Sequence, residues 1–134
     1  MVKFTASVEA KADDTVMQFV MCGLEAVTNT HIQHWTTTSY AKHQALGEFY
    51  ESMQELIDTW VEAFMGKYGV LTAFPTASEV MANVDPIAYL QELNAKIAQY
   101  RAAPNFPKDT ELQNLTDEIV AQIDATLYKL TRLN

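Results

Sequence analysis

The stretch that decides the fold lies near the C-terminus, where residues 110–130 read TELQNLTDEIVAQIDATLYKL. Its large apolar side chains recur in steps of three and four: Leu112, Leu115, Ile119, Ile123, Leu127 and Leu130. This spacing places all of them on one face of an α-helix, because 3.6 residues make one turn. The stretch therefore predicts an amphipathic helix that starts near Asp109 or Thr110 and buries one face in a core.

Three further segments repeat this pattern, and local residues mark their ends. Asp85 provides an N-cap, and the proline after it fits the first turn, for a helix predicted over residues 86–103. A longer helix is predicted over about residues 40–68, with Gly69 ending it. The first helix is predicted over about residues 15–37, after a run of good capping residues.

The lengths of the connections indicate how these helices are arranged. Residues 36–39 and 105–108 are short breaks, so the helices on either side of each must lie antiparallel. Residues 70–85 form a long connection, with room for a short helix after Ser78. We therefore predict an all-α four-helix bundle of the ferritin-like kind, with a long crossover between helices 2 and 3. An up-and-down bundle is the alternative if residues 70–85 do not cross the bundle.

Composition narrows the class of protein. The 134 residues carry 17 acidic and 9 basic side chains, a net charge of -8, which argues against direct nucleic-acid binding. Cys22 is the one cysteine, so no disulfide can form within the chain, which suits a reducing compartment. No stretch approaches the roughly 20 apolar residues of a membrane span. These features predict a soluble cytoplasmic protein that forms a single domain over residues 1–134.

The N-terminus follows a different pattern. Residues 2–9 alternate between apolar and polar side chains, which is typical of a β-strand. A lone strand needs the edge of another sheet or another subunit to satisfy its backbone. We therefore expect residues 1–12 to form an extended arm, either paired in that way or loosely ordered.

Five carboxylates recur in steps of three and four along the second predicted helix, and we call them the acidic stripe: Glu48, Glu51, Glu55, Asp58 and Glu62. On a helical wheel the stripe lies opposite the apolar residues of the same segment, so it is predicted to face water. These carboxylates therefore cannot form a metal site inside their own bundle. Any imidazole that joins them in binding a metal must come from another subunit.

The three histidines lie close to the first predicted turn. His31 and His34 fall on the apolar side of the first helix, and His43 falls on the flank of the second. A histidine on the apolar side of a helix usually packs with a satisfied hydrogen bond, whereas the flank position of His43 suits either an interface residue or a ligand. The alternative is a metal ligand, because imidazole and carboxylate are the groups that iron prefers in non-haem sites.

One combination of these residues resembles a known family. His34-Trp35, then His43, then Asp58 and Glu62 are similar to the ferroxidase motif of the Dps-type mini-ferritins, and the resemblance runs from about residue 20 to the C-terminus. It implies a ferritin-like subunit of a homo-oligomer, a dimer or a larger shell, that oxidises or sequesters iron at intersubunit sites. The implied metal ligands, with no catalytic residue beyond them, are His34, His43, Asp58 and Glu62, with His31 and Glu48 as weaker ones.

The motif is incomplete in this chain. Gly47 stands four residues after His43, where the family places an aspartate ligand, and the spacing from His34 to His43 is shorter than in the family. The Lys/Arg-rich tail by which some members hold DNA is also missing from the N-terminus. Loss of the aspartate predicts weaker affinity for iron, a single-metal site or a different metal.

Two hypotheses of different classes follow. The first is the ferritin-like protein with intersubunit iron sites and possible ferroxidase activity. The second is a non-enzymatic acidic helical bundle whose acidic stripe binds a protein or mimics nucleic acid. Small virus-encoded proteins are often short, acidic and helical in this way. The two differ in what Asp58 and Glu51 do: the first requires metal binding at Asp58, and the second requires partner binding at Glu51.

Overall fold

The structure is a computed structural model that describes residues 9–81 and 84–133. The described chain forms α-helices and connections, with no strand among those residues. The helices are α1 (Glu9–Thr36), α2 (Tyr40–Tyr68), α3 (Pro86–Ala102) and α4 (Thr110–Arg132). The predicted all-α class and the four helices are therefore confirmed. None of these helices is long and apolar enough to cross a membrane, as far as the described residues extend.

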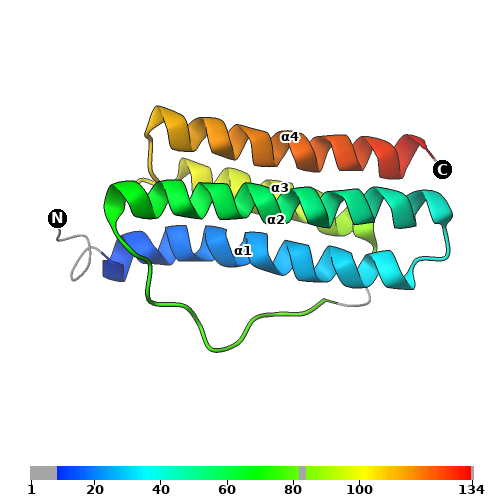
Figure 1. The fold of residues 1–134 in the computed structure, drawn as a ribbon, viewed down its shortest axis with the longest axis horizontal. Helices are drawn as coiled ribbons and strands as arrows, with labels where there is room; N and C mark the ends of the chain where they lie inside the picture. The colour runs from blue at the N-terminus through cyan, green and yellow to red at the C-terminus, as the bar shows by residue number, and fades with distance from the viewer. Residues whose placement is uncertain (1–8, 82–83, 134) are drawn as a thin grey trace.

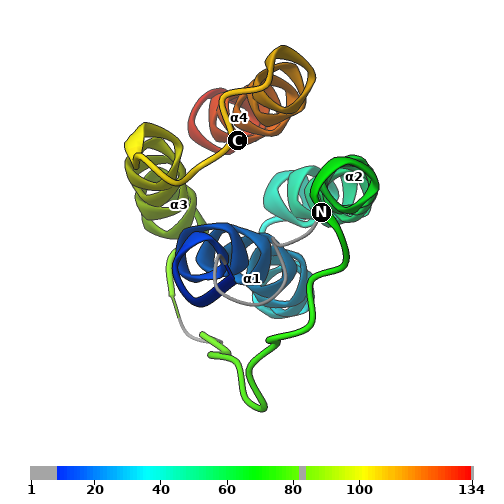
Figure 2. The ribbon, with the colours of Figure 1, turned by 90° about the vertical axis from the view of Figure 1, so that its left-hand side faces the viewer.

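The helices form a bundle in which each lies beside two others. In Figure 2 they occupy the corners of a square, and the contacting pairs are α1 with α2, α2 with α4, α4 with α3, and α3 with α1. Figure 1 shows α2 and α3 running in the same direction, so the connection between them returns along the whole bundle. The long crossover between α2 and α3 is therefore confirmed, and the up-and-down alternative is wrong. This connectivity, with one long crossover, is that of ferritin-like bundles.

Capping residues explain both ends of α2 and the start of α3. The Ser39 hydroxyl accepts a hydrogen bond from the Lys42 amide (3.2 Å) at the start of α2, and the Asp85 carboxylate accepts one from the Ala88 amide (3.0 Å) at the start of α3. Gly69 ends α2 with φ 103°, a conformation that favours glycine. These boundaries agree with the sequence prediction because each depends on local residues.

The start of α1 and the crossover differ from the prediction. α1 begins at Glu9, earlier than the start near Thr15, because the Glu-Ala-Lys-Ala run favours helix strongly enough to extend it. The expected extended arm is therefore wrong for residues 9–12, and residues 1–8 lie outside the described part of the chain. The crossover contains no helix in its described residues, so the short helix after Ser78 does not form there.

An aromatic cluster forms the centre of the core. The fully buried Trp60 ring lies against Phe19 (4.6 Å between ring centroids), Phe64 (5.5 Å) and Phe106 (5.7 Å). Its indole Nε1 donates a hydrogen bond to the buried Thr116 hydroxyl (3.0 Å). A buried tryptophan needs such a partner for its N–H group. The cluster brings together α1, α2, α4 and the turn that contains Phe106. Its packed rings set the distances between these helices.

A polar cluster links the end of α2 to the start of α4. The Asp109 carboxylate accepts a hydrogen bond from Tyr68 (2.5 Å) and pairs with Lys67 (2.6 Å). The hydrogen bonds from Lys67 and Tyr68 lower the pKa of Asp109 below its usual value, and the same bonds raise the pKa values of Lys67 and Tyr68. Asp109 therefore joins two helices instead of capping α4 with its side chain.

Candidate functional site

The turn between α1 and α2 is closed by two histidines. His34 Nδ1 lies 2.6 Å from the His43 carbonyl oxygen, and His43 Nδ1 lies 2.8 Å from the His34 carbonyl oxygen. Because a carbonyl oxygen only accepts, each Nδ1 donates its proton. The two rings stack with centroids 3.7 Å apart. His34 and His43, which we call the histidine turn, are thus packed and hydrogen-bonded, which is the packed arrangement that the sequence predicted for His34 as the alternative to a metal ligand.

His31 belongs to a second stack beside the histidine turn. Its ring lies 4.0 Å from Tyr50 and 4.3 Å from Trp35, centroid to centroid. Tyr50 also meets the His34 ring edge-on at 5.4 Å, so the two stacks are continuous. The His31 ring therefore packs among aromatic rings at the end of the bundle.

Gly47 lies directly against the histidine turn. A Cβ atom at this position would stand 3.0 Å from His34 Cε1 and 3.2 Å from His34 Nδ1, closer than ordinary contacts allow. The His34 ring thus occupies the space that a side chain at position 47 needs. This packing gives a physical reason for a glycine where the mini-ferritins have an aspartate.

The structure confirms that the acidic stripe faces outwards. All five of its residues are exposed: Glu48, Glu51, Glu55, Asp58 and Glu62. Glu48 pairs with Lys129 of α4 at 2.6 Å. Across the described ranges, no other carboxylate of the stripe takes part in an ion pair within 4.0 Å.

The predicted metal ligands do not meet within one chain. His43 and Asp58 are fifteen residues apart on α2, which is about 22 Å along a helix. Among the residues that the structure describes, no group of three or more His, Cys, Asp or Glu side chains could hold a metal ion. A site that combines His34 or His43 with Asp58 and Glu62 thus requires a second subunit, and it stays a prediction.

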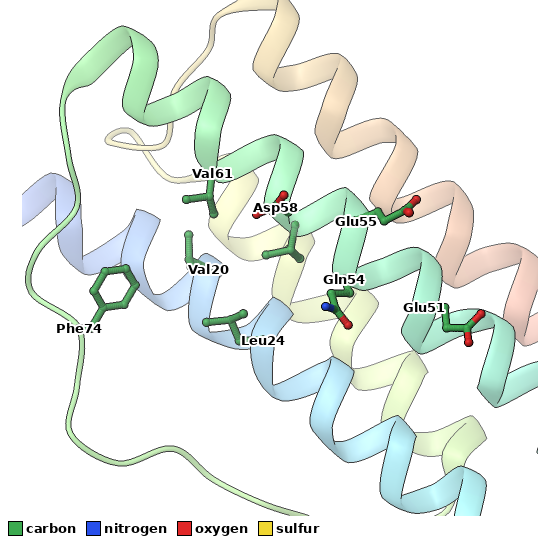
Figure 3. Close-up of a pocket in the computed structure, with 9 residues that line it drawn as sticks. Val20, Leu24, Glu51, Gln54, Glu55, Asp58, Val61 and Phe74 are labelled. Carbon is green, nitrogen blue, oxygen red and sulfur yellow. The ribbon is translucent and has the colours of Figure 1, made fainter.

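A groove that sequence reasoning missed runs beside the acidic stripe. It has a volume of about 730 Å³ and lies between α1, α2 and the crossover, and its lining residues are Val20, Leu24, Glu51, Gln54, Glu55, Ile57, Asp58, Val61 and Phe74. Figure 3 shows Phe74 of the crossover across from α1 and α2, with Asp58, Glu55 and Glu51 in succession along α2. Its size falls in the range of binding pockets.

The groove combines an apolar floor with an acidic edge. Leu24 is 44% exposed and Phe74 is 45% exposed, which is unusual for large apolar side chains that line the same groove. The helical spacing places Leu24 with the apolar residues of α1, and nothing in that spacing shows that its side chain does not reach the core. The position of Phe74 depends on the path of the crossover, which periodicity does not determine.

A smaller cavity of about 270 Å³ lies on the other side of α1, between α1, α3 and the end of the crossover. The Asn29 side chain is fully hydrogen-bonded there: Nδ2 donates to the Tyr89 hydroxyl (3.1 Å), and Oδ1 accepts from the Met81 amide (2.8 Å). Burial raises the pKa of Cys22 to about 12, so this thiol stays protonated and is a poor nucleophile. The hydrogen bond from Met81 to Asn29 therefore holds the end of the crossover against α1. The Cys22 thiol beside it is unreactive.

The fold and the groove define a four-helix bundle with an acidic-edged groove on its surface. Residues 34–130 match a family of unknown function (DUF5856), and since the match covers most of the chain, the protein belongs to that family. The matched region begins at the histidine turn and includes all of α2, α3 and the acidic stripe. No curated protein and no solved structure matches the chain.

Proposed function

We propose that the protein is a non-enzymatic binding module that uses its acidic stripe to hold a positively charged partner protein. The observation that supports this proposal is the row of exposed carboxylates at Glu51, Glu55, Asp58 and Glu62, which form no ion pair with the described part of the chain. Like charges held in a row repel one another, and a basic partner relieves that repulsion. Such a row also attracts a basic partner over distance and speeds association.

Within the described ranges the acidic stripe forms a single ion pair, between Glu48 and Lys129. Elsewhere carboxylates connect helices, as Asp109 does with Lys67 and Asp117 with Arg101 (2.5 Å). Surface charges that stabilise the fold are expected in such pairs, although each contributes little. Within the described ranges the stripe contributes no such link beyond Glu48, so its charge is available to an external partner.

Charge reversal in the acidic stripe tests this proposal. The double change Glu51→Lys and Glu55→Lys is expected to weaken capture of partner proteins from a cell extract by about tenfold or more, with the fold unchanged by circular dichroism. The loss arises because like charges then oppose a basic partner. The matched control is Glu92→Lys with Glu118→Lys, which changes the net charge equally on α3 and α4. Equal capture by both double variants would contradict the proposal.

A second function, iron oxidation or sequestration between subunits, is supported by a different observation. Asp58 and Glu62 lie one helical turn apart on the exposed face of α2, so both can reach a neighbouring molecule. In the histidine turn the hydrogen bonds to backbone use Nδ1 of each ring, which leaves Nε2 of His34 and His43 for an external ligand. Under this proposal the chain is a ferritin-like subunit of a homo-oligomer, and Fe(II) is its substrate.

Mass in solution and an Fe(II) oxidation assay test the iron proposal together. The iron proposal requires an oligomer that oxidises Fe(II), and under it the change Asp58→Ala should reduce oxidation by about tenfold or more while the fold persists. Glu118→Ala, an exposed change on α4, serves as the control. A monomer that does not oxidise Fe(II), or equal oxidation by Asp58→Ala and the original protein, would reject this function.

A further inference from the structure

We propose that the partner presents a basic amphipathic α-helix, and that this helix lies in the groove between α1, α2 and the crossover. The inference rests on the proposed binding function and adds the class of partner and the place where it docks. It starts from the position of the groove, since Glu51, Glu55 and Asp58 belong both to the acidic stripe and to the groove lining.

The apolar floor of the groove indicates that the partner presents an apolar face. Leu24 and Phe74 expose nearly half of their surface, and the groove continues over Val20, Ile57 and Val61. Contiguous apolar surface rimmed by polar groups is a mark of protein-interaction sites. Burying it requires apolar side chains from another molecule.

The acidic rim of the groove indicates that the partner carries positive charge beside its apolar face. Three carboxylates and the Gln54 amide stand along the α2 side, and no basic residue lines the groove within the described ranges. A lysine or arginine beside an apolar stripe would pair with these carboxylates. A second copy of this chain fits poorly, because two surfaces of a protein with net charge -8 would place acid against acid.

The dimensions favour a helix as the bound element. The lining residues of α2 extend from Glu51 to Val61, which lie ten positions apart, or about 15 Å along the axis. That length matches roughly three turns of a docked helix, which presents apolar residues at steps of three and four. The outer wall is Phe74, from an irregular part of the crossover between the buried Leu71 and the anchoring hydrogen bond from the Glu79 amide to Glu25 (3.1 Å).

A designed peptide of defined sequence tests the inference directly. The probe is a helical peptide of about 14 leucine and lysine residues with all leucines on one face. The first comparison peptide has the same composition in an order that gives no apolar face, and the second replaces lysine with glutamate. By fluorescence anisotropy, the amphipathic basic peptide should bind at least about tenfold more tightly than either comparison peptide.

Variants of the groove floor locate the binding. Leu24→Ser with Phe74→Ser should weaken binding of the amphipathic basic peptide by about tenfold or more, because both side chains are exposed anchors for its apolar face. Tyr128→Ser, which removes an exposed aromatic side chain from α4, should leave binding unchanged. Both proteins should keep their helical circular dichroism.

The outcomes separate this inference from the proposed function. If Glu51→Lys with Glu55→Lys abolishes partner capture but the groove-floor variant binds the peptide normally, the docking inference fails and the binding function stands. Equal affinity for the peptide without an apolar face also overturns the inference. If light scattering shows a dimer that the groove-floor variant dissociates, the occupant is a second copy and the inference is wrong. If charge reversal has no effect on capture, the proposed function itself fails.

Discussion

Replacing Trp60 with alanine is expected to lower the free energy of unfolding by about 3–5 kcal/mol, a large part of the roughly 5–15 kcal/mol that holds a small domain together. The indole is fully buried and packs against Phe19, Phe64 and Phe106. Truncation leaves a cavity at the point where α1, α2 and α4 meet. It also removes the donor to Thr116, whose hydroxyl still donates to the Leu112 carbonyl (2.8 Å).

Trp35 provides the matched control for this change. It is 66% exposed and contacts the His31 ring at the surface, so Trp35→Ala should change stability by less than about 1 kcal/mol. Urea unfolding followed by far-ultraviolet circular dichroism measures both variants without depending on tryptophan fluorescence. Equal unfolding midpoints for the two variants would show that the Trp60 cluster is not the centre of the core.

Helix positions could be predicted because they depend on residues close in sequence. The periodic stripe of α4 appears in the core as predicted, with Leu112, Ile119, Ile123 and Leu130 buried. Gly69 and Asp85 end and start helices through their own backbone or side chain. The outward direction of the acidic stripe also followed from the helical period alone. None of these features depends on where the other helices lie.

The surroundings of the histidines could not be predicted in the same way. The wheel placed His34 on the apolar side of its helix, but its exchange of hydrogen bonds with His43 depends on how tightly α1 and α2 turn. Gly47 looked like a missing ligand, and only the packed structure shows the His34 ring in that space. Contacts between helices determine which groups surround His34 and Gly47. The helical period of one segment does not describe those contacts.

The groove was missed for a related reason. Glu51, Glu55 and Asp58 were recognised as one acidic stripe, but the apolar floor beside them comes from three separate segments of the chain. Phe74 enters the groove because the crossover follows the outside of α1, as Figure 2 shows for the segment as a whole. The sequence predicted that a long crossover exists, but it did not predict which side of the bundle the crossover follows. A binding surface that depends on that path becomes visible only when the fold is known.

The close approach of α1 and α2 leads to the second large expected effect, at Gly23. A Cβ atom there would lie 2.2 Å from Ile57 Cδ1 and 2.6 Å from Ile57 Cγ1, inside a buried interface. Overpacking of this kind costs about 1–3 kcal/mol, while exchanging glycine for alanine in a helix returns about 1 kcal/mol. We therefore expect Gly23→Ala to destabilise the protein by up to about 2 kcal/mol in urea unfolding, which is the overpacking cost less the gain in helix preference.

Two companion variants separate the clash from the intrinsic preference of the helix. Gly66 is exposed in α2 with no atom within 4 Å of an added Cβ, so Gly66→Ala should stabilise the protein by about 0.5–1 kcal/mol. Ile57→Ala removes both clashing atoms, and in that background Gly23→Ala should become neutral or stabilising, since the new methyl group then fills part of the cavity. The sign of the Gly23 effect therefore depends on Ile57. If Gly23→Ala destabilised equally in both backgrounds, the contact between α1 and α2 would not be as close as the structure shows.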